Sequence, residues 1–290
     1  MLNLNYVGSH SGHLNFAGMK NTAEFPAPGT PAQVAARRQY PYIVPVAWDS
    51  GAGNGNYNAL QASLQKSTSS GLTYLLAYTW SKSIDLACSG TYAQCLLQDP
   101  YHPQADRSVS DFDLTNIFSA SVVYELPVGR GRALNVQSGI LNGLIGGWFV
   151  NSIVSFSSGT PYSATVTGDI ANTGNTFVQA NAIANPTLSN PSPQEWFNTS
   201  ALVSPARYSF GTFGRNALRS DGFGNIDLSV FKTFALPRSA RLQFRAESFN
   251  LTNSVVFGIP NSTVGTPTFG VVSATANAPR IMQFSGKLQF

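Results

Sequence analysis

The stretch that decides the fold is Leu72-Thr73-Tyr74-Leu75-Leu76-Ala77-Tyr78-Thr79-Trp80-Ser81. Side chains alternate between the two faces of an extended strand. One face therefore collects large apolar and aromatic residues, namely Leu72, Tyr74, Leu76, Tyr78 and Trp80, and the other is mainly small or hydroxylated. The stretch is about as long as the roughly 9 to 11 residues that a tilted membrane strand needs. It predicts a strand with one face toward lipid and Trp80 near an interface.

The same alternation recurs elsewhere and separates charge from apolar side chains. Near the C-terminus, Leu242, Phe244 and Ala246 share one face, whereas the intervening positions are charged or polar: Arg241, Gln243, Arg245 and Glu247. Residues 112–126 repeat most of the pattern, with Leu114, Phe118, Val122 and Tyr124 on one face. Charges that are confined to one face indicate a wet interior side opposite a lipid-facing side.

Composition supports a membrane β-barrel and excludes several other classes. Only 10% of the 290 residues are charged, against roughly 25% in soluble domains. Mean hydropathy is −0.03, and no apolar run approaches the roughly 18 residues of a membrane helix. The net charge of +4 is dispersed, which gives no support to nucleic-acid binding. A water-soluble β-sandwich remains the alternative, although it usually carries more surface charge.

The order of strands and connections is more informative than any single strand. Segments of period two predict about eight strands, near 2–8, 57–66, 71–84, 112–126, 146–158, 223–236, 239–252 and 280–290. Short turns alternate with long Gly/Asn/Ser/Pro-rich loops at 9–56, 85–111, 159–222 and 253–279. We therefore expect an all-β, antiparallel transmembrane β-barrel segment with long external loops and short periplasmic turns. It would be part of a larger barrel or an open half-barrel.

Several motifs in order resemble a known family. They include Tyr57-Asn58-Ala59-Leu60, Ala77-Tyr78-Thr79-Trp80-Ser81, Ser158-Gly159-Thr160-Pro161-Tyr162, Gly214-Arg215-Asn216 and Glu247-Ser248-Phe249-Asn250. Together they resemble the barrel of the large TonB-dependent receptors of soil acidobacteria, in which a carboxypeptidase-regulatory-like domain precedes the plug. The resemblance implies a bacterial outer-membrane protein for energised uptake of an unknown small-molecule ligand, such as an oligosaccharide or a metal chelate.

The resemblance covers only the C-terminal part of such receptors, whose barrels have about 22 strands. Met1 is followed at once by the alternating segment 2–8, with no signal-peptide pattern and no plug. We therefore expect residues 1–290 to be a fragment, the C-terminal part of an outer-membrane β-barrel. Its expected partners are outer-membrane lipid, the outer-membrane assembly machinery, and TonB through N-terminal parts that lie outside this sequence.

The last strand ends in an aromatic residue. Phe284, Leu288 and Phe290 share one face, and this ending resembles the signal that the assembly machinery reads. A plain last strand would alternate in the same way, so the pattern by itself leaves both interpretations open.

The predicted external loops hold the remaining candidate site residues. Cys88 and Cys95 fall in one loop, where oxidising conditions favour a disulfide over two unpaired thiols. Asp106, Asp111 and Asp113 are possible calcium ligands, but no glycine-centred oxygen-ligand loop surrounds them, and a loop-anchoring role with Arg107 is favoured. Five loop aromatics are able to stack on a ligand such as a sugar ring, or to pack within the loops: Tyr92, Tyr101, Trp196, Phe197 and Tyr208.

No catalytic, cofactor or metal motif is recognisable, so we expect no enzyme and no cofactor. The glycine-rich run 51–56 is interpreted as flexible loop rather than a phosphate-binding loop. A structural or adhesive outer-membrane barrel that displays long surface loops is the alternative function. A passive pore is physically weak, because about eight strands enclose only side chains.

Overall fold

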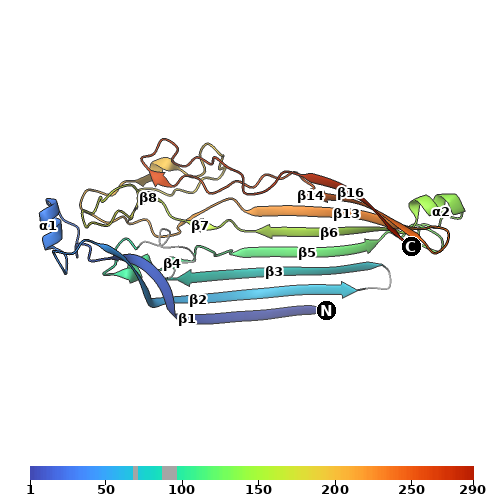
Figure 1. Cartoon of the computed structure of the whole chain (residues 1–290), viewed down its shortest axis with the longest axis horizontal. Helices are drawn as coiled ribbons and strands as arrows, with labels where there is room; N and C mark the ends of the chain where they lie inside the picture. Colours follow the sequence, from blue (N-terminus) through green and yellow to red (C-terminus); the bar gives the residue numbers. More distant parts are fainter. Residues whose placement is uncertain (68–70, 87–96) are drawn as a thin grey trace.

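The computed structural model describes residues 1–67, 71–86 and 97–290, and one antiparallel sheet dominates it (Figure 1). Eight long strands follow one another in the sheet: β1 (Leu2–Lys20), β2 (Val46–Ser67), β3 (Leu72–Asp85), β5 (Asn116–Glu125), β6 (Trp148–Ser157), β13 (Phe223–Ala235), β14 (Arg241–Phe249) and β16 (Ile281–Gln289). The short β4 (Ser108–Val109) pairs with the end of β3. The predicted all-β, antiparallel class is confirmed.

Each strand pairs with its neighbour in the chain, as in an up-and-down barrel. Among the described residues the sheet does not close, since β1 pairs only with β2 and β16 only with β14. The long connections gather at one end of the strands, whereas the short turns and both termini lie toward the other end (Figure 1). This is the predicted alternation of external loops and periplasmic turns.

The prediction of one loop over 9–56 is wrong, because β1 continues to Lys20 and β2 begins at Val46. The run 51–56 therefore lies in a strand and not in a flexible loop. Close packing requires glycine at position 53, where a Cβ would lie 2.3 Å from the carbonyl oxygen of Leu86 and 2.6 Å from that of Leu14. Two register shifts near Leu14 bend this part of the hairpin.

Strand register assigns the two faces of the sheet. Tyr6, Leu60 and Trp80 form one row across β1, β2 and β3, and all three are largely exposed, as expected of side chains that meet lipid. Arg245 and Glu247 lie on the opposite face and form an ion pair of 3.3 Å. The apolar face is the outer wall, and the charged face is the inner wall.

The long external connections contain short paired strands of their own. Short strands pair within them: β7 (Pro161–Tyr162) with β12 (Leu218–Arg219), β10 (Asn181–Ala182) with β11 (Leu202–Val203), and β8 (Thr165–Val166) with both β9 (Val178–Gln179) and β15 (Thr263–Val264). Two 3₁₀ turns, η1 (Pro103–Asp106) and η2 (Thr199–Ala201), complete them. We call this assembly of residues 97–115, 158–222 and 250–280 the loop layer.

Two short helices lie outside the loop layer. Helix α1 (Pro31–Ala36) begins with a Thr30–Gln33 capping box in the β1–β2 connection. Helix α2 (Gly139–Ile145) is in the β5–β6 turn and is capped by Ser138. Among the described residues, no helix has the length and apolar character to span a membrane.

Candidate functional site

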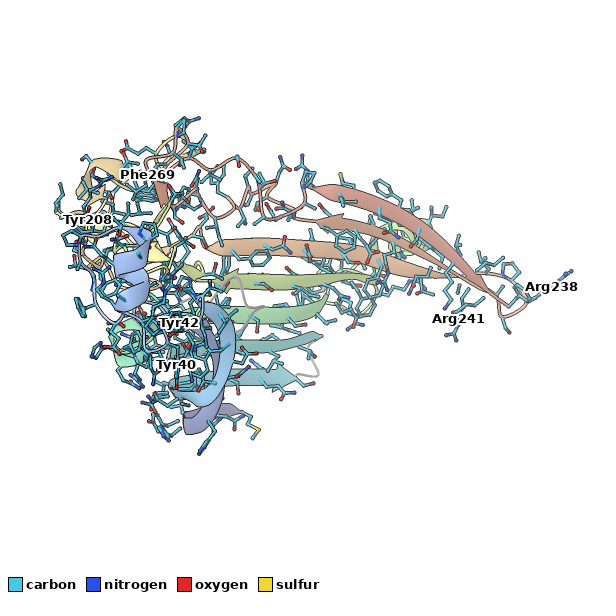
Figure 2. The ribbon with its side chains drawn as sticks, turned by 60° about the vertical axis from the view of Figure 1, so that its left-hand side comes forward. Tyr40, Tyr42, Tyr208, Arg238, Arg241 and Phe269 are labelled. Atoms are coloured by element: carbon cyan, nitrogen blue, oxygen red, sulfur yellow. The ribbon has the colours of Figure 1, made fainter. Side chains whose placement is uncertain are left out.

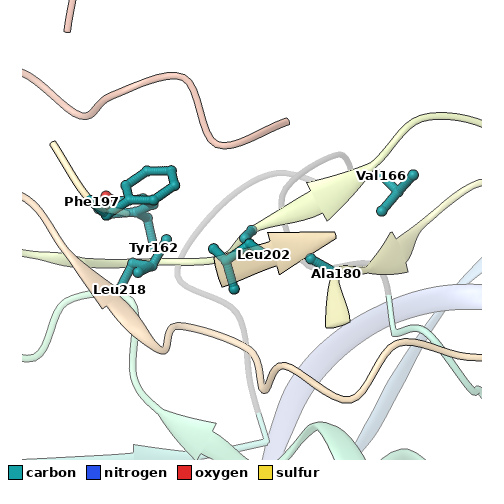
Figure 3. Packing of buried hydrophobic residues seen from close by; sticks show 7 residues of the cluster. Tyr162, Val166, Ala180, Phe197, Leu202 and Leu218 are labelled. Carbon is teal, nitrogen blue, oxygen red and sulfur yellow. The ribbon is translucent and has the colours of Figure 1, made fainter. Parts of the chain in front are cut away.

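The main apolar core of the described residues lies in the loop layer. It is formed by residues of four short strands and of the segments between them: Tyr162, Ala164, Val166, Ala180, Phe197, Leu202 and Leu218 (Figure 3). The ring of Phe197 packs at 5.1 Å from that of Phe269. Burial of these side chains stabilises the loop layer as a unit of its own, because the inner wall is mostly polar and offers few apolar contacts.

Two ion pairs with buried carboxylates connect residues 159–222 to β3, one directly at Asp85 and one through Asp113. Arg215 donates to the Asp85 carboxylate at 2.5 Å and to the Asp85 carbonyl oxygen at 2.9 Å. Arg219 donates to the Asp113 carboxylate at 2.5 Å, and Asp113 in turn accepts from the backbone N–H of Ser83 at 2.7 Å. Asp85 and Ser83 belong to β3, so both arginines tie the 159–222 connection to that strand and its neighbour.

A third buried carboxylate, that of Asp106, holds the loop segments to one another. Its oxygens accept from the backbone N–H of Gln98 at 2.9 Å and from the amide of Gln179 at 2.5 Å. Burial raises the pKa of this carboxyl above its ordinary value, and the two hydrogen bonds and the nearby Arg215 charge oppose that rise only in part.

The raised pKa of Asp106 predicts a pH dependence. Between the ordinary and the raised pKa, the folded state holds a proton that the unfolded state has lost, so stability falls as pH rises through this window and returns as pH falls. The Asp106→Asn variant lacks this titration. We expect the stability of the wild type to improve relative to that of the variant on acidification, measured by thermal unfolding followed by tryptophan fluorescence. A difference that does not vary with pH would contradict this account.

A cavity of about 470 Å³ opens between the apolar core and the segment that carries Arg219. Its lining includes Tyr162, Leu188, Trp196, Arg219 and Asp221. The Tyr162 hydroxyl is buried and has no hydrogen-bond partner among the described residues, and burial raises the pKa of this phenol. The cavity thus combines aromatic surface with polar groups, the usual composition of a small-molecule site.

The predicted loop aromatics occupy different environments. Trp196 lines the cavity, and its indole N–H donates to the Arg219 carbonyl oxygen at 3.2 Å. Phe197 is 2% exposed and belongs to the core, so its position fits the alternative of packing within the loops. Tyr101 donates its hydroxyl to the Thr22 carbonyl oxygen at 2.8 Å. Tyr208 lies at the distal tip of the loop layer (Figure 2).

The other predicted site residues are divided between the C-terminal strand and an undescribed segment. Phe284 and Leu288 project from the outer face of β16, paired with Ala246 and Leu242, and Phe290 is fully exposed. Cys88, Cys95 and Tyr92 lie outside the described residues, as does the proposed disulfide.

The anchoring carboxylates were predicted with the wrong partner. Arg107 donates to the Asn54 side chain at 3.0 Å, whereas Asp113 pairs with Arg219. Asp106 accepts from the Gln98 backbone N–H and from the Gln179 side-chain amide. Sequence reasoning missed the Asp85–Arg215 pair, although Arg215 lies in the Gly214-Arg215-Asn216 motif. In the parts of the chain that the structure covers, no group of three or more His, Cys, Asp or Glu side chains is placed to hold a metal ion.

The antiparallel sheet of consecutive strands, its apolar outer face and the loop layer at one end are together typical of an outer-membrane β-barrel protein. Residues 1–283 match the sequence profile of the outer membrane beta barrel domain, so the chain belongs to this family and lies in the bacterial outer membrane, in contact with lipid.

A search among solved structures finds similarity to the outer membrane transporter YddB from Escherichia coli. The TM-score is 0.47 at 9% identity, over 98% of this chain and 29% of the transporter chain. Among curated proteins, no sequence matches the chain.

Proposed function

We propose that this chain is the C-terminal barrel region of a TonB-dependent receptor that takes up a scarce ligand across the outer membrane. The observation that carries the proposal is the loop layer, which is fastened to β3 of the inner wall by the Asp85–Arg215 pair and by Asp113, which binds both Ser83 and Arg219. A layer held there lies where a ligand would enter the lumen. The ordered sequence motifs agree with the same class of receptor.

The cavity indicates the ligand class within this proposal. Trp196 and Tyr162 supply flat apolar surface, and Arg219 and Asp221 supply polar groups among the lining residues. A sugar ring presents both an apolar face and hydroxyls, so an oligosaccharide is the favoured ligand. A metal chelate is the runner-up, and it would use mainly the Arg219 charge.

Two partners belong to the proposal as well. TonB would act through receptor segments that are not part of residues 1–290. The assembly machinery would read Phe284, Leu288 and Phe290 at the end of β16. In this account the chain has no enzymatic activity, because its side chains bind and guide a ligand without changing it.

One observation favours adhesion as a second candidate function. The connection between β1 and β2 exposes Tyr40, Tyr42, Ile43 and Val44, and Tyr42 is fully exposed (Figure 2). Neighbouring exposed apolar side chains of this kind are typical of a surface that binds a partner. In that case the barrel anchors the β1–β2 connection, and the cavity has no role.

Uptake measurements in the producing bacterium separate the two functions. Cells with and without the gene are grown on single oligosaccharides as limiting carbon source, and import is measured with and without a protonophore. We expect Trp196→Ala to lower import about tenfold, since an aromatic stacking contact contributes up to roughly 1.5 kcal/mol.

Two control variants complete the measurement. Trp196→Phe preserves much of the packing against the core and should retain most import, and Tyr42→Ala should leave import unchanged. If the gene deletion leaves import intact and abolishes surface attachment, and Tyr42→Ala does the same, the uptake proposal fails in favour of adhesion.

A further inference from the structure

The periplasmic turn between β5 and β6 carries an unusually apolar surface. Helix α2 has no charged residue, and four of its seven residues have large, apolar and exposed side chains: Ile140, Leu141, Leu144 and Ile145. Ile140 is 82% exposed. Leu134, in the same turn, is also exposed. Water is a poor environment for such a surface, so the turn has an apolar face without a partner among the described residues.

Specific contacts hold α2 beside the outer wall. Trp148, Lys232 and Phe244 form one row across β6, β13 and β14, on the apolar face of the sheet. The Trp148 indole N–H donates to the Leu144 carbonyl oxygen at 2.9 Å, and the Lys232 ammonium donates to the Gly143 carbonyl oxygen. The exposed side chains of α2 are therefore continuous with the lipid-facing surface.

An aromatic cluster marks the membrane interface at this level. The Trp148 ring meets Phe234 at 6.5 Å and Phe244 at 6.3 Å, both edge to face. Tryptophan and phenylalanine near the end of barrel strands are typical of the aromatic girdle at the lipid headgroups. Helix α2 thus lies at headgroup depth on the short-turn side of the sheet (Figure 1).

Cationic side chains gather next to the helix. A cavity of about 420 Å³ between the turn and the end of β13 is lined by Arg130, Arg132 and Lys232 as well as by Glu125, and Arg132 pairs with Glu125. One carboxylate among three cations leaves an excess of positive charge. A phosphate group is the complement of such a cavity, and the apolar helix is the complement of acyl chains.

We infer that the β5–β6 turn is a phospholipid-binding anchor, in which α2 inserts into the periplasmic leaflet and the adjoining cavity holds an anionic headgroup. The lipopolysaccharide of the opposite leaflet is excluded by position, because the long loops define the external end. The anchor does not depend on which ligand the loop layer binds.

Photo-crosslinking in the outer membrane of producing cells tests the anchor without purification. A diazirine amino acid replaces Leu144, or in a second variant Ile140, and the adducts are identified by mass spectrometry. Ile183, an exposed apolar residue of the loop layer, is the matched control. We expect phospholipid adducts at both α2 positions at least tenfold above those at Ile183. Adducts to a protein or to lipopolysaccharide, or equal yields at the control, would overturn the inference.

A second experiment tests whether the cavity beside α2 binds an anionic headgroup. Arg130→Gln should lower the anionic share of the crosslinked phospholipids about fivefold, since one arginine near a lipid surface contributes roughly 1 kcal/mol. Arg280→Gln, an exposed arginine at the opposite end of the strands, should leave that share unchanged. If both variants behave alike, the cavity is not a headgroup site.

Discussion

Replacing Arg215 with methionine is expected to release the loop layer from the inner wall. The side chains of Asp85 and Arg215 are 5% and 10% exposed, so the variant leaves a buried carboxylate without its counter-charge. Removing one partner of a buried pair costs about 3 to 5 kcal/mol. The open fraction of the loop layer should therefore rise by roughly 100-fold or more, and cleavage by proteinase K in isolated outer membranes should accelerate accordingly.

Two variants show whether the buried charge is responsible. Arg207→Met removes an exposed loop arginine and should leave the cleavage rate within about twofold of the wild type. The double variant Asp85→Asn, Arg215→Met removes both charges and should recover much of the protection, because no uncompensated charge remains. If the single and double variants are cleaved equally fast, the ion pair is not what holds the loop layer.

Strands were predictable from sequence because a membrane wall imposes its pattern directly on the chain. Each position of β3 or β14 faces either lipid or the interior, so Leu72 to Trp80 and Arg241 to Glu247 show their faces without reference to any other strand. The run 51–56 is the exception, since it lies in β2 and not in a loop. Residues 51–56 have the composition of a loop, and only the approach of Leu14 and Leu86 to Gly53 explains why glycine stands in a strand there.

Partners of buried charges were not predictable in the same way. Asp85 and Arg215 are 130 positions apart, and nothing near either residue indicates the other. Asp106 and Asp113 both lie within a few positions of Arg107, which favoured a local ion pair, yet the fold places Arg219 beside Asp113. The exposed apolar surface of α2 was not predictable either, because it depends on contacts with distant residues. Trp148 and Lys232 hold the helix beside the outer wall.

The second large effect concerns the edges of the sheet. Met1 and Gln65 exchange both backbone hydrogen bonds, at 2.7 and 2.9 Å. Because bonding direction alternates along an antiparallel strand, Asn3 and Asn5 point their backbone groups toward β2, and Leu2 and Leu4 point theirs to the open side. Lipid has no water to satisfy such groups, and each unpaired one costs several kcal/mol there. Chain 1–290 by itself should therefore associate through this edge.

Purified chain 1–290 in detergent is expected to run as dimers or larger assemblies of the 30.9 kDa chain, measured by light scattering. Leu4→Pro removes an outward N–H and keeps the pairing with β2, so it should shift the distribution toward monomer. Asn5→Pro removes an inward N–H instead, and it should weaken the β1–β2 pairing without relieving association. A wild-type chain that runs as a protease-resistant, heat-modifiable monomer would show that the sheet closes on itself, because only a closed barrel removes both edges.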